Sequence, residues 1–139
     1  MILLDTSAVL SALFPDQNRH EECAVALAQA EFPILPPFVL AEIDYMILKR
    51  VGIELELNFL NDVARGGYEL APFGGEDLAA AIAIVEQYRS LRIGLADASI
   101  VVLAERYGTR DILTLNERHF RALRPLTGRK SFRLLPADA

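Results

Sequence analysis

Short apolar runs alternate with longer amphipathic stretches along the whole chain. The first run, residues 1–4, is wholly apolar and ends at Asp5-Thr6-Ser7, a pattern typical of a strand buried on both faces. Further β-rich runs predict strands at residues 32–35, 68–71, 112–115 and 131–135. Helical spacing, bounded by prolines and glycines, predicts helices at residues 7–14, 18–30, 38–51, 53–65, 76–91, 96–107 and 117–123.

Strands that alternate with helices predict an α/β fold. We expect a single domain over residues 1–139, with a central, mainly parallel sheet of about four to five short strands flanked by helices. Asp5 would lie at the carboxyl end of the first strand, where open α/β sheets bind their ligands. Asp also favours the N-cap of a helix, so this segment alone leaves open whether Asp5 binds a ligand or caps a helix.

Composition narrows the class of protein. The chain has 139 residues, of which 53% are hydrophobic, so one domain with a substantial core is expected. Cys23 is the one cysteine, which excludes an intrachain disulfide and fits a reducing compartment. No run reaches about 18 apolar residues, the length of a membrane span, and the apolar start lacks the basic residues of a signal peptide. We therefore expect a cytoplasmic protein without membrane contact.

Charge is unevenly distributed along the chain. The net charge of −5 is unusual for a protein that binds nucleic acid. However, residues 1–100 hold 6 Lys/Arg and 15 Asp/Glu, whereas residues 101–139 hold 8 Lys/Arg and 4 Asp/Glu. Such asymmetry favours a polyanionic partner, although an ordinary Arg-rich surface would give the same distribution.

Three carboxylates stand in apolar settings with no Lys or Arg close by in the sequence. Asp5 ends a predicted buried strand, Glu42 lies early in an apolar helix, and Asp97 is surrounded by small and apolar residues. Because acidic side chains are almost never buried without a partner, a shared cation would account for all three. With oxygen ligands only, that cation should be Mg²⁺ or Mn²⁺. Local alternatives are that Asp97 caps its helix and that Glu42 interacts with the helix dipole.

These motifs occur in a distinctive order. Asp5-Thr6-Ser7 follows the first strand, Ala41-Glu42 lies in a helix after a proline-rich strand exit, Gly94-Leu95-Ala96-Asp97-Ala98 opens a late helix, and Ile112-Leu113-Thr114-Leu115 precedes Arg118-His119-Phe120. Over essentially its whole length the chain resembles the PIN-domain ribonucleases, specifically the VapC-type toxins of bacterial toxin–antitoxin pairs. The resemblance implies a doubly wound parallel sheet, Mg²⁺-dependent hydrolysis of phosphodiester bonds in structured RNA, a homodimer, and inhibition by a small cognate antitoxin.

The resemblance also implies a catalytic site made of Asp5, Glu42, Asp97 and Asn116. Asp5 and Asp97 would hold the metal directly or through water, and Glu42 would be a ligand or orient the attacking water. Asn116 stands where many relatives carry a fourth acid; an amide oxygen could still ligate a metal, but it brings no charge. The alternative function is therefore a catalytically weakened PIN-fold module that acts mainly by binding its antitoxin or RNA.

Polar and basic neighbours would complete the site. Ser7 or Thr6 would hydrogen-bond the acids, or else cap the first helix. His119 is a predicted phosphate contact, with general acid as the alternative role. The candidates for contacts with RNA backbone phosphates are Arg118, His119, Arg121, Arg124, Arg129, Lys130 and Arg133.

Two further expectations concern the helices over residues 38–65. Their apolar content predicts a groove that would bind the antitoxin as a helix, although these helices could equally serve only to cover the sheet. Tyr45 and Tyr68 are predicted to be packing residues.

Overall fold

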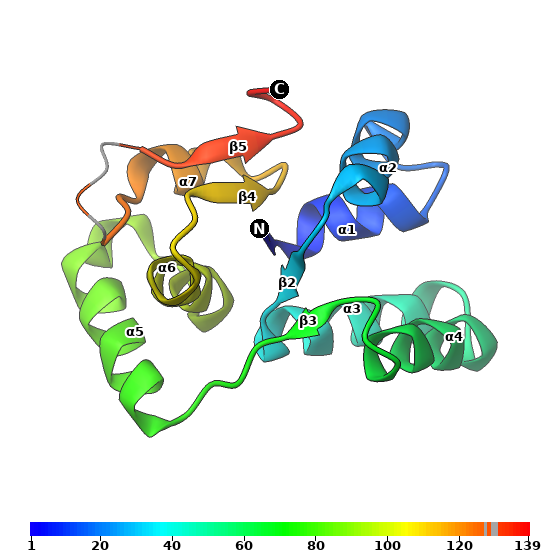
Figure 1. Cartoon of the computed structure of the whole chain (residues 1–139), viewed down its shortest axis with the longest axis horizontal. Coiled ribbons are helices and arrows are strands. Elements are labelled where there is room, and N and C mark those ends of the chain that lie inside the picture. Colours follow the sequence, from blue (N-terminus) through cyan, green and yellow to red (C-terminus); the bar gives the residue numbers. More distant parts are fainter. Residues whose placement is uncertain (127, 129–130) are drawn as a thin grey trace.

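The computed structural model describes residues 1–126, 128 and 131–139 and arranges five strands among helices (Figure 1). Arg129 and Lys130, two of the predicted phosphate contacts, lie outside the described residues. In chain order the elements are β1 (Ile2–Leu4), α1 (Thr6–Leu13), α2 (His20–Gln29), β2 (Pro33–Leu35), α3 (Pro37–Arg50), α4 (Ile53–Ala64), β3 (Glu69–Leu70), α5 (Gly75–Gln87), the 3₁₀ turn η1 (Arg89–Leu91), α6 (Leu95–Tyr107), β4 (Asp111–Leu113), α7 (Glu117–Ala122) and β5 (Arg133–Leu135).

The strands form one parallel sheet in the order β3-β2-β1-β4-β5, which confirms the predicted α/β class. Strand β1 is central, and its Leu3 is in register with Ile34 of β2 and Ile112 of β4. All three side chains have 0% exposed surface. The apolar run at the start of the chain therefore forms a strand with neighbours on both edges and helices over both faces.

The chain reverses its direction across the sheet at β1. It proceeds from β1 to β2 and β3 on one side, and then crosses to β4 and β5 on the other. Figure 1 shows α3 and α4 together on one side of the molecule and α5 and α6 on the other. The carboxyl ends of β1 and β4 therefore flank the topological switch point, where doubly wound sheets bind their ligands. Residues 5–7 and 114–116 follow these two strand ends.

Two predicted helices differ from the observed ones for local backbone reasons. Helix α2 begins at His20 rather than near residue 18, because Arg19 adopts the left-handed conformation with φ of 59°. The predicted helix over residues 76–91 ends at Gln87 and continues as the turn η1. Glycines end other helices as expected, since Gly108 has φ of 66° after α6 and Gly52 has φ of 140° after α3. Among the described helices, none combines the length and apolarity that crossing a bilayer requires.

Substitution of a β1 core residue tests whether this strand anchors the fold. We expect Leu3→Ala to lower the free energy of unfolding by about 2–5 kcal/mol, because it leaves a cavity at a fully buried position. Leu57→Ala on α4 is the matched control, since Leu57 is 46% exposed, and it should change stability by no more than about 0.5 kcal/mol. Urea denaturation of both variants measures the difference, and equal losses would contradict the assignment.

Candidate active site

Asp5 is the buried acid at the carboxyl end of β1. Its backbone N–H donates to the carbonyl oxygen of Leu113 at 3.0 Å, which extends the pairing of β1 with β4. Its residue surface is only 5% exposed. Asp5 is therefore the N-cap residue of α1 by position, but its carboxylate does not make the capping hydrogen bond.

Two hydroxyl groups hold one oxygen of the Asp5 carboxylate. Ser7 Oγ donates to Asp5 Oδ2 at 2.8 Å, and Thr114 Oγ1 donates to the same oxygen at 2.6 Å. Thr114 is 1% exposed and directly follows β4. Its role was missed at the level of sequence, although a hydroxyl residue at the end of the strand next to β1 was the available signal. Among the described residues, no side chain donates to Asp5 Oδ1.

Asp97 lies in the first turn of α6 and faces the start of α7. His119 Nδ1 is 2.6 Å from Asp97 Oδ2, and the two side chains are 20% and 15% exposed. The N-cap of α6 is Gly94, so Asp97 is not the helix cap that the sequence left open. The fold thus places His119 on a site carboxylate, a contact that the sequence did not predict.

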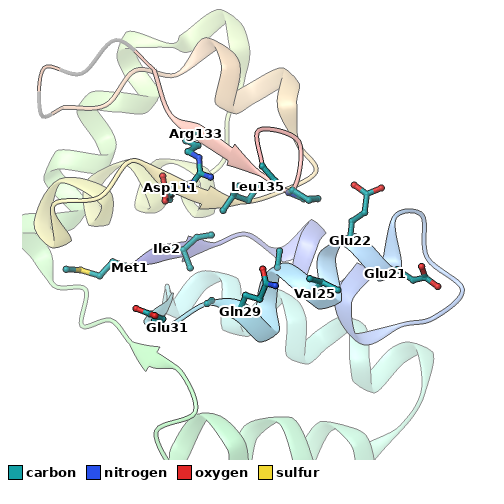
Figure 2. A pocket seen from close by; sticks show the side chains of 14 residues that line it. Met1, Ile2, Glu21, Glu22, Val25, Gln29, Glu31, Asp111, Arg133 and Leu135 are labelled. Atoms are coloured by element: carbon teal, nitrogen blue, oxygen red, sulfur yellow. Dashed lines mark hydrogen bonds and ion pairs between the residues drawn. The ribbon is translucent and has the colours of Figure 1, made fainter.

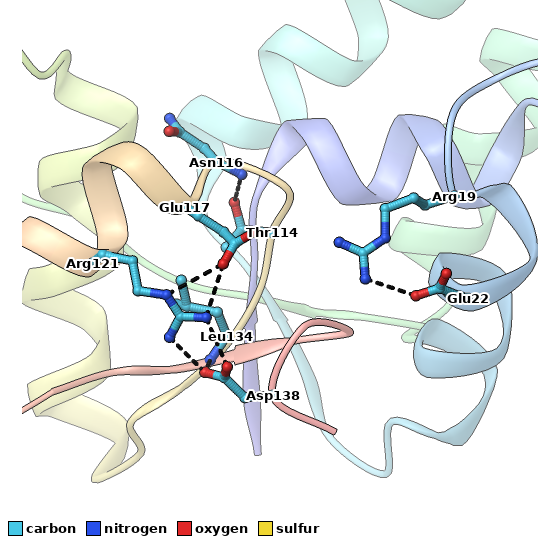
Figure 3. Close-up of polar contacts among 8 residues, drawn as sticks. All are labelled: Arg19, Glu22, Thr114, Asn116, Glu117, Arg121, Leu134 and Asp138. Carbon is cyan, nitrogen blue, oxygen red and sulfur yellow. Dashed lines mark hydrogen bonds and ion pairs between the residues drawn. The ribbon is translucent and has the colours of Figure 1, made fainter.

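Asn116 connects the loop after β4 to α7. Its side-chain oxygen accepts a hydrogen bond from the backbone N–H of His119 at 3.2 Å and so caps α7. Its amide nitrogen lies 3.0 Å from His119 Nδ1. Its own backbone N–H donates to Thr114 Oγ1 at 2.9 Å (Figure 3). Asn116 therefore contacts Thr114, which holds Asp5, and His119, which holds Asp97.

Glu42 is more open than its apolar helix led us to expect. It is exposed on α3, and Thr6 Oγ1 donates to Glu42 Oε1 at 2.5 Å. No acid lies in the first turn of α3, so the helix-dipole alternative is wrong as well. A solvent-facing carboxylate near the buried Asp5 and the half-buried Asp97 can still receive a ligand or hold a water molecule.

Two hollows meet at Glu42. One, of about 660 Å³, is lined by Asp5, Ser7, Glu42 and Asn116 on its polar side. The other, of about 370 Å³, is lined by Glu42 and Asp97. Together they open the predicted acids to solvent at the switch point of the sheet, which is the expected place for a ligand.

A hollow of about 680 Å³ lies elsewhere, between α2 and the sheet (Figure 2). Its lining includes Ile2, Asp111 and Arg133, which are the first residues of β1, β4 and β5. It therefore reaches the amino ends of these strands, the opposite end of the sheet from Asp5. Arg133 pairs with Asp111 there at 3.2 Å, and this hollow is not the candidate site.

The electrostatics of the acids indicate uncompensated negative charge. Burial raises the pKa of Asp5 above its ordinary value; hydrogen bonds from Thr114 and Ser7 offset part of this rise, and the charge of Asp97 adds to it. Burial likewise raises the pKa of Asp97; the hydrogen bond and charge of His119 lower it, and the charge of Glu42 raises it. Asp97 therefore repels Asp5, and Glu42 repels Asp97.

The donor chemistry of the site fits a hard divalent cation, with a limit on its geometry. Asp5 is buried, and in the described part of the chain no Lys or Arg pairs with it. A cation would remove the repulsion and keep the acids ionised. However, no group of three or more His, Cys, Asp or Glu among the described residues gathers closely enough to enclose a metal. The fit is therefore to an ion held by one or two carboxylates and by water, which is usual for Mg²⁺.

Three of the predicted phosphate contacts, His119, Arg121 and Arg133, have carboxylate partners within the chain. Arg121 bridges Glu117 at 2.9 Å and Asp138 at 2.7 Å (Figure 3), so it would have to leave both to bind a phosphate. Arg118 is exposed on α7, and no ion pair involves it among the residues the structure describes. Arg118 is therefore the basic residue of this group most available to an anion.

The two tyrosines behave differently. Tyr68 packs against Phe59, with ring centroids 5.5 Å apart, as predicted. Tyr45 is 60% exposed and lines the hollow that contains Asp5, so the prediction that it is a packing residue is wrong. Cys23 has no exposed surface and lies in the core.

The sequence is similar to one protein family over most of its length. Residues 2–124 match the family model described as PIN domain. The chain is 45% identical over 138 residues to ribonuclease VapC26 of Mycobacterium tuberculosis, an alignment that covers 97% of this chain and 100% of the relative.

Solved structures share the fold at lower identity. The crystal structure of M. tuberculosis VapC20, described as a sarcin–ricin-loop-cleaving toxin, aligns with a TM-score of 0.73 at 14% identity and covers 81% of this chain and 87% of that one. VapBC2 from Rickettsia felis, bound to a DNA fragment from its promoter, aligns with a TM-score of 0.65 at 24% identity and covers 91% and 96%. At these identities the similarity supports the fold alone.

Because the pKa of Asp5 is raised, we expect the folding stability of the metal-free protein to depend on pH. A carboxyl group with a raised pKa in the folded state still holds its proton at pH values where the unfolded chain has released it. Stability therefore falls as the pH rises through this range, and the loss persists at neutral pH. Asp5→Asn keeps the shape and removes the charge, so we expect a higher Tm than wild type at pH 7 in EDTA, with the difference shrinking toward about pH 4.

Thermal unfolding of both proteins across this pH range measures the effect. Asp16→Asn is the control, because Asp16 is exposed, and its Tm should follow that of the wild type at every pH. A Tm difference between Asp5→Asn and wild type that does not vary with pH would contradict the electrostatic origin.

Proposed function

The chain belongs to the PIN-domain family and to its VapC-type members, and from this premise we propose that it is a metal-dependent endoribonuclease, the toxin of a toxin–antitoxin pair. The proposed reaction is hydrolysis of phosphodiester bonds in structured RNA, with Mg²⁺ or Mn²⁺ as the cofactor. The observation that carries the proposal is the buried carboxylate of Asp5, which has no cationic partner among the described residues and stands at the switch point of the sheet. The 45% identity to a named ribonuclease supports the same reaction.

Asp5 and Asp97 would hold the cation, directly or through water. A bound Mg²⁺ would polarise the scissile phosphate, lower the pKa of the attacking water and stabilise the leaving oxygen. Glu42 is exposed and fixed by Thr6, so it would ligate the ion or orient the attacking water. Ser7 and Thr114 keep Asp5 Oδ2 occupied, which leaves Oδ1 for the ligand.

Arg118 is proposed to contact the RNA backbone. It is exposed on α7, two residues after the Asn116 that lines the hollow with Asp5. A contact with a backbone phosphate would position the RNA without reading its sequence. His119 is engaged with Asp97, so we assign it to the carboxylate rather than to the RNA.

The first test is RNA cleavage by the purified chain. We expect cleavage of folded RNA with Mg²⁺ or Mn²⁺ and none with EDTA. Asp5→Asn and Asp97→Asn should lower the rate by more than about 100-fold, which exceeds the loss usual for residues that only support a metal ligand. Asp16→Asn, the exposed control, should keep the wild-type rate.

The outcome separates the two candidate functions. Cleavage that continues in EDTA, or in both aspartate variants, would contradict the metal mechanism. RNA binding without cleavage by the wild-type chain would favour the alternative, a PIN-fold module that acts through binding, for which the amide at Asn116 in place of an acid is the favouring observation.

We also propose a cognate antitoxin as partner, seated on α3 and α4. Large apolar side chains remain exposed along these two packed helices, and a helical antitoxin segment could bury them. They are Tyr45, Leu48, Val51, Ile53 and Leu57. A separate exposed apolar stripe on α5, at helical spacing, is proposed as the contact of the homodimer. It consists of Leu78, Ile82 and Val85.

One pair of matched variants tests both surfaces. Leu48→Glu on α3 should weaken capture of the small protein encoded beside this chain by at least about tenfold and leave the chain's self-association unchanged. Ile82→Glu on α5 should do the reverse. Affinity capture from co-expression and light scattering of the isolated chain measure the two properties. A monomeric wild-type chain, or antitoxin capture that survives Leu48→Glu, would contradict the corresponding assignment.

A further inference from the structure

We propose that the segment Thr114–His119 positions both metal-binding aspartates, and that Asn116 is the residue that joins its two halves. The inference rests on the proposed function only in assigning a divalent cation to Asp5 and Asp97. It gives Asn116 a role that differs from the one the sequence left open, an amide oxygen that ligates the metal. Asn116, Thr114 and His119 are accordingly positioning residues, which act on the cation through the aspartates.

The first half of the segment, Thr114–Asn116, is connected to Asp5 by hydrogen bonds. The backbone N–H groups of Leu115 and Asn116 donate to Ser7 Oγ at 3.0 Å and to Thr114 Oγ1 at 2.9 Å. Each hydroxyl then donates its one proton to Asp5 Oδ2, at 2.8 Å and 2.6 Å respectively. A hydroxyl group has one proton to donate and can also accept hydrogen bonds. Each of these hydroxyls therefore accepts from a backbone N–H and donates to Asp5. Two backbone groups of the segment thereby fix the rotation of the Asp5 carboxylate.

The second half, Asn116–His119, is connected by hydrogen bonds to Asp97. Asn116 Oδ1 accepts the backbone N–H of His119 at 3.2 Å and so fixes the first turn of α7. The His119 ring then reaches Asp97 Oδ2 at 2.6 Å through Nδ1. An ionised carboxylate can only accept, so Nδ1 carries the proton and donates it to Asp97. Asp97 is held through one oxygen, as Asp5 is, and in the described part of the chain no hydrogen bond involves Asp97 Oδ1.

The same geometry explains an amide at position 116. Its nitrogen lies 3.0 Å from His119 Nδ1, close enough for a group at this position to compete for the Nδ1 proton. A carboxylate there would accept that proton and draw it from Asp97. The NH₂ group of an amide cannot accept it, so Asp97 keeps the hydrogen bond. An uncharged residue at position 116 thus belongs to a site whose cation is held by the other acids.

The test is the affinity of the full chain for Mn²⁺, measured by isothermal titration calorimetry at fixed pH without RNA. We expect His119→Ala and Asn116→Ala each to weaken Mn²⁺ binding by about tenfold, the usual loss when the group that orients a metal ligand is removed. Asn116→Ser keeps an oxygen that can cap α7 and should stay within about threefold of wild type. Glu117→Gln, an exposed neighbour on the same helix, is the control and should bind Mn²⁺ as the wild type does.

A double variant separates positioning from general destabilisation. If Asn116 acts on Asp97 through His119, the pair His119→Ala/Asn116→Ala should bind Mn²⁺ no more than about threefold more weakly than His119→Ala alone. Circular dichroism at the titration temperature shows whether each variant is folded. A purely structural role would lower the Tm of these variants and leave their Mn²⁺ affinity at that temperature unchanged.

Each contrary result overturns the proposal. Wild-type or tighter Mn²⁺ binding by folded His119→Ala would show that the ring does not orient Asp97 for the ion. Full additivity in the double variant would show that Asn116 does not act through His119, and absence of Mn²⁺ binding by the wild-type chain would remove the premise. Failure to cleave RNA while the affinities change as expected would instead contradict the proposed function and leave the positioning role intact.

Discussion

The candidate site depends on one constraint, a carboxylate buried at the end of the central strand. Asp5 is 5% exposed, and removing a charge from water is costly unless it is paired or hydrogen-bonded. Ser7 and Thr114 supply hydrogen bonds but no positive charge. Natural proteins keep such an arrangement at functional sites, where the local cost is offset when the ligand binds. The sheet topology brings β4 next to β1 and thereby delivers Thr114 to Asp5.

Much of the fold follows from the hydrophobic pattern. A wholly apolar three-residue strand indicates that both of its faces are covered, and Ile2, Leu3 and Leu4 of β1 are all buried. The elements that shifted did so through single backbone conformations, such as the left-handed Arg19. The order of the strands could not be derived from periodicity, and was available only through the resemblance to a known family.

The site was predictable in its acids and less so in their partners. Asp5 and Asp97 stand out because an apolar environment makes a carboxylate conspicuous, whereas Glu42 proved to be exposed. The contact between His119 and Asp97 joins residues 22 positions apart across two helices. Thr114 lies 109 positions from Asp5. No local rule of spacing reports such pairs, so hydrogen-bond partners needed the three-dimensional structure. The basic C-terminal part also supports RNA binding less than its charge suggested, because Arg121 and Arg133 form ion pairs within the chain.

The proposed mechanism requires a divalent cation at the carboxylates of Asp5 and Asp97. The most direct measurement is a crystal structure of the chain soaked in Mn²⁺, with the ion located by its anomalous scattering. We expect an ion at the carboxylates of Asp5 and Asp97, held directly or through water, with Asn116 still bound to His119. An ion located away from Asp5, or none at a concentration that supports RNA cleavage, would contradict it.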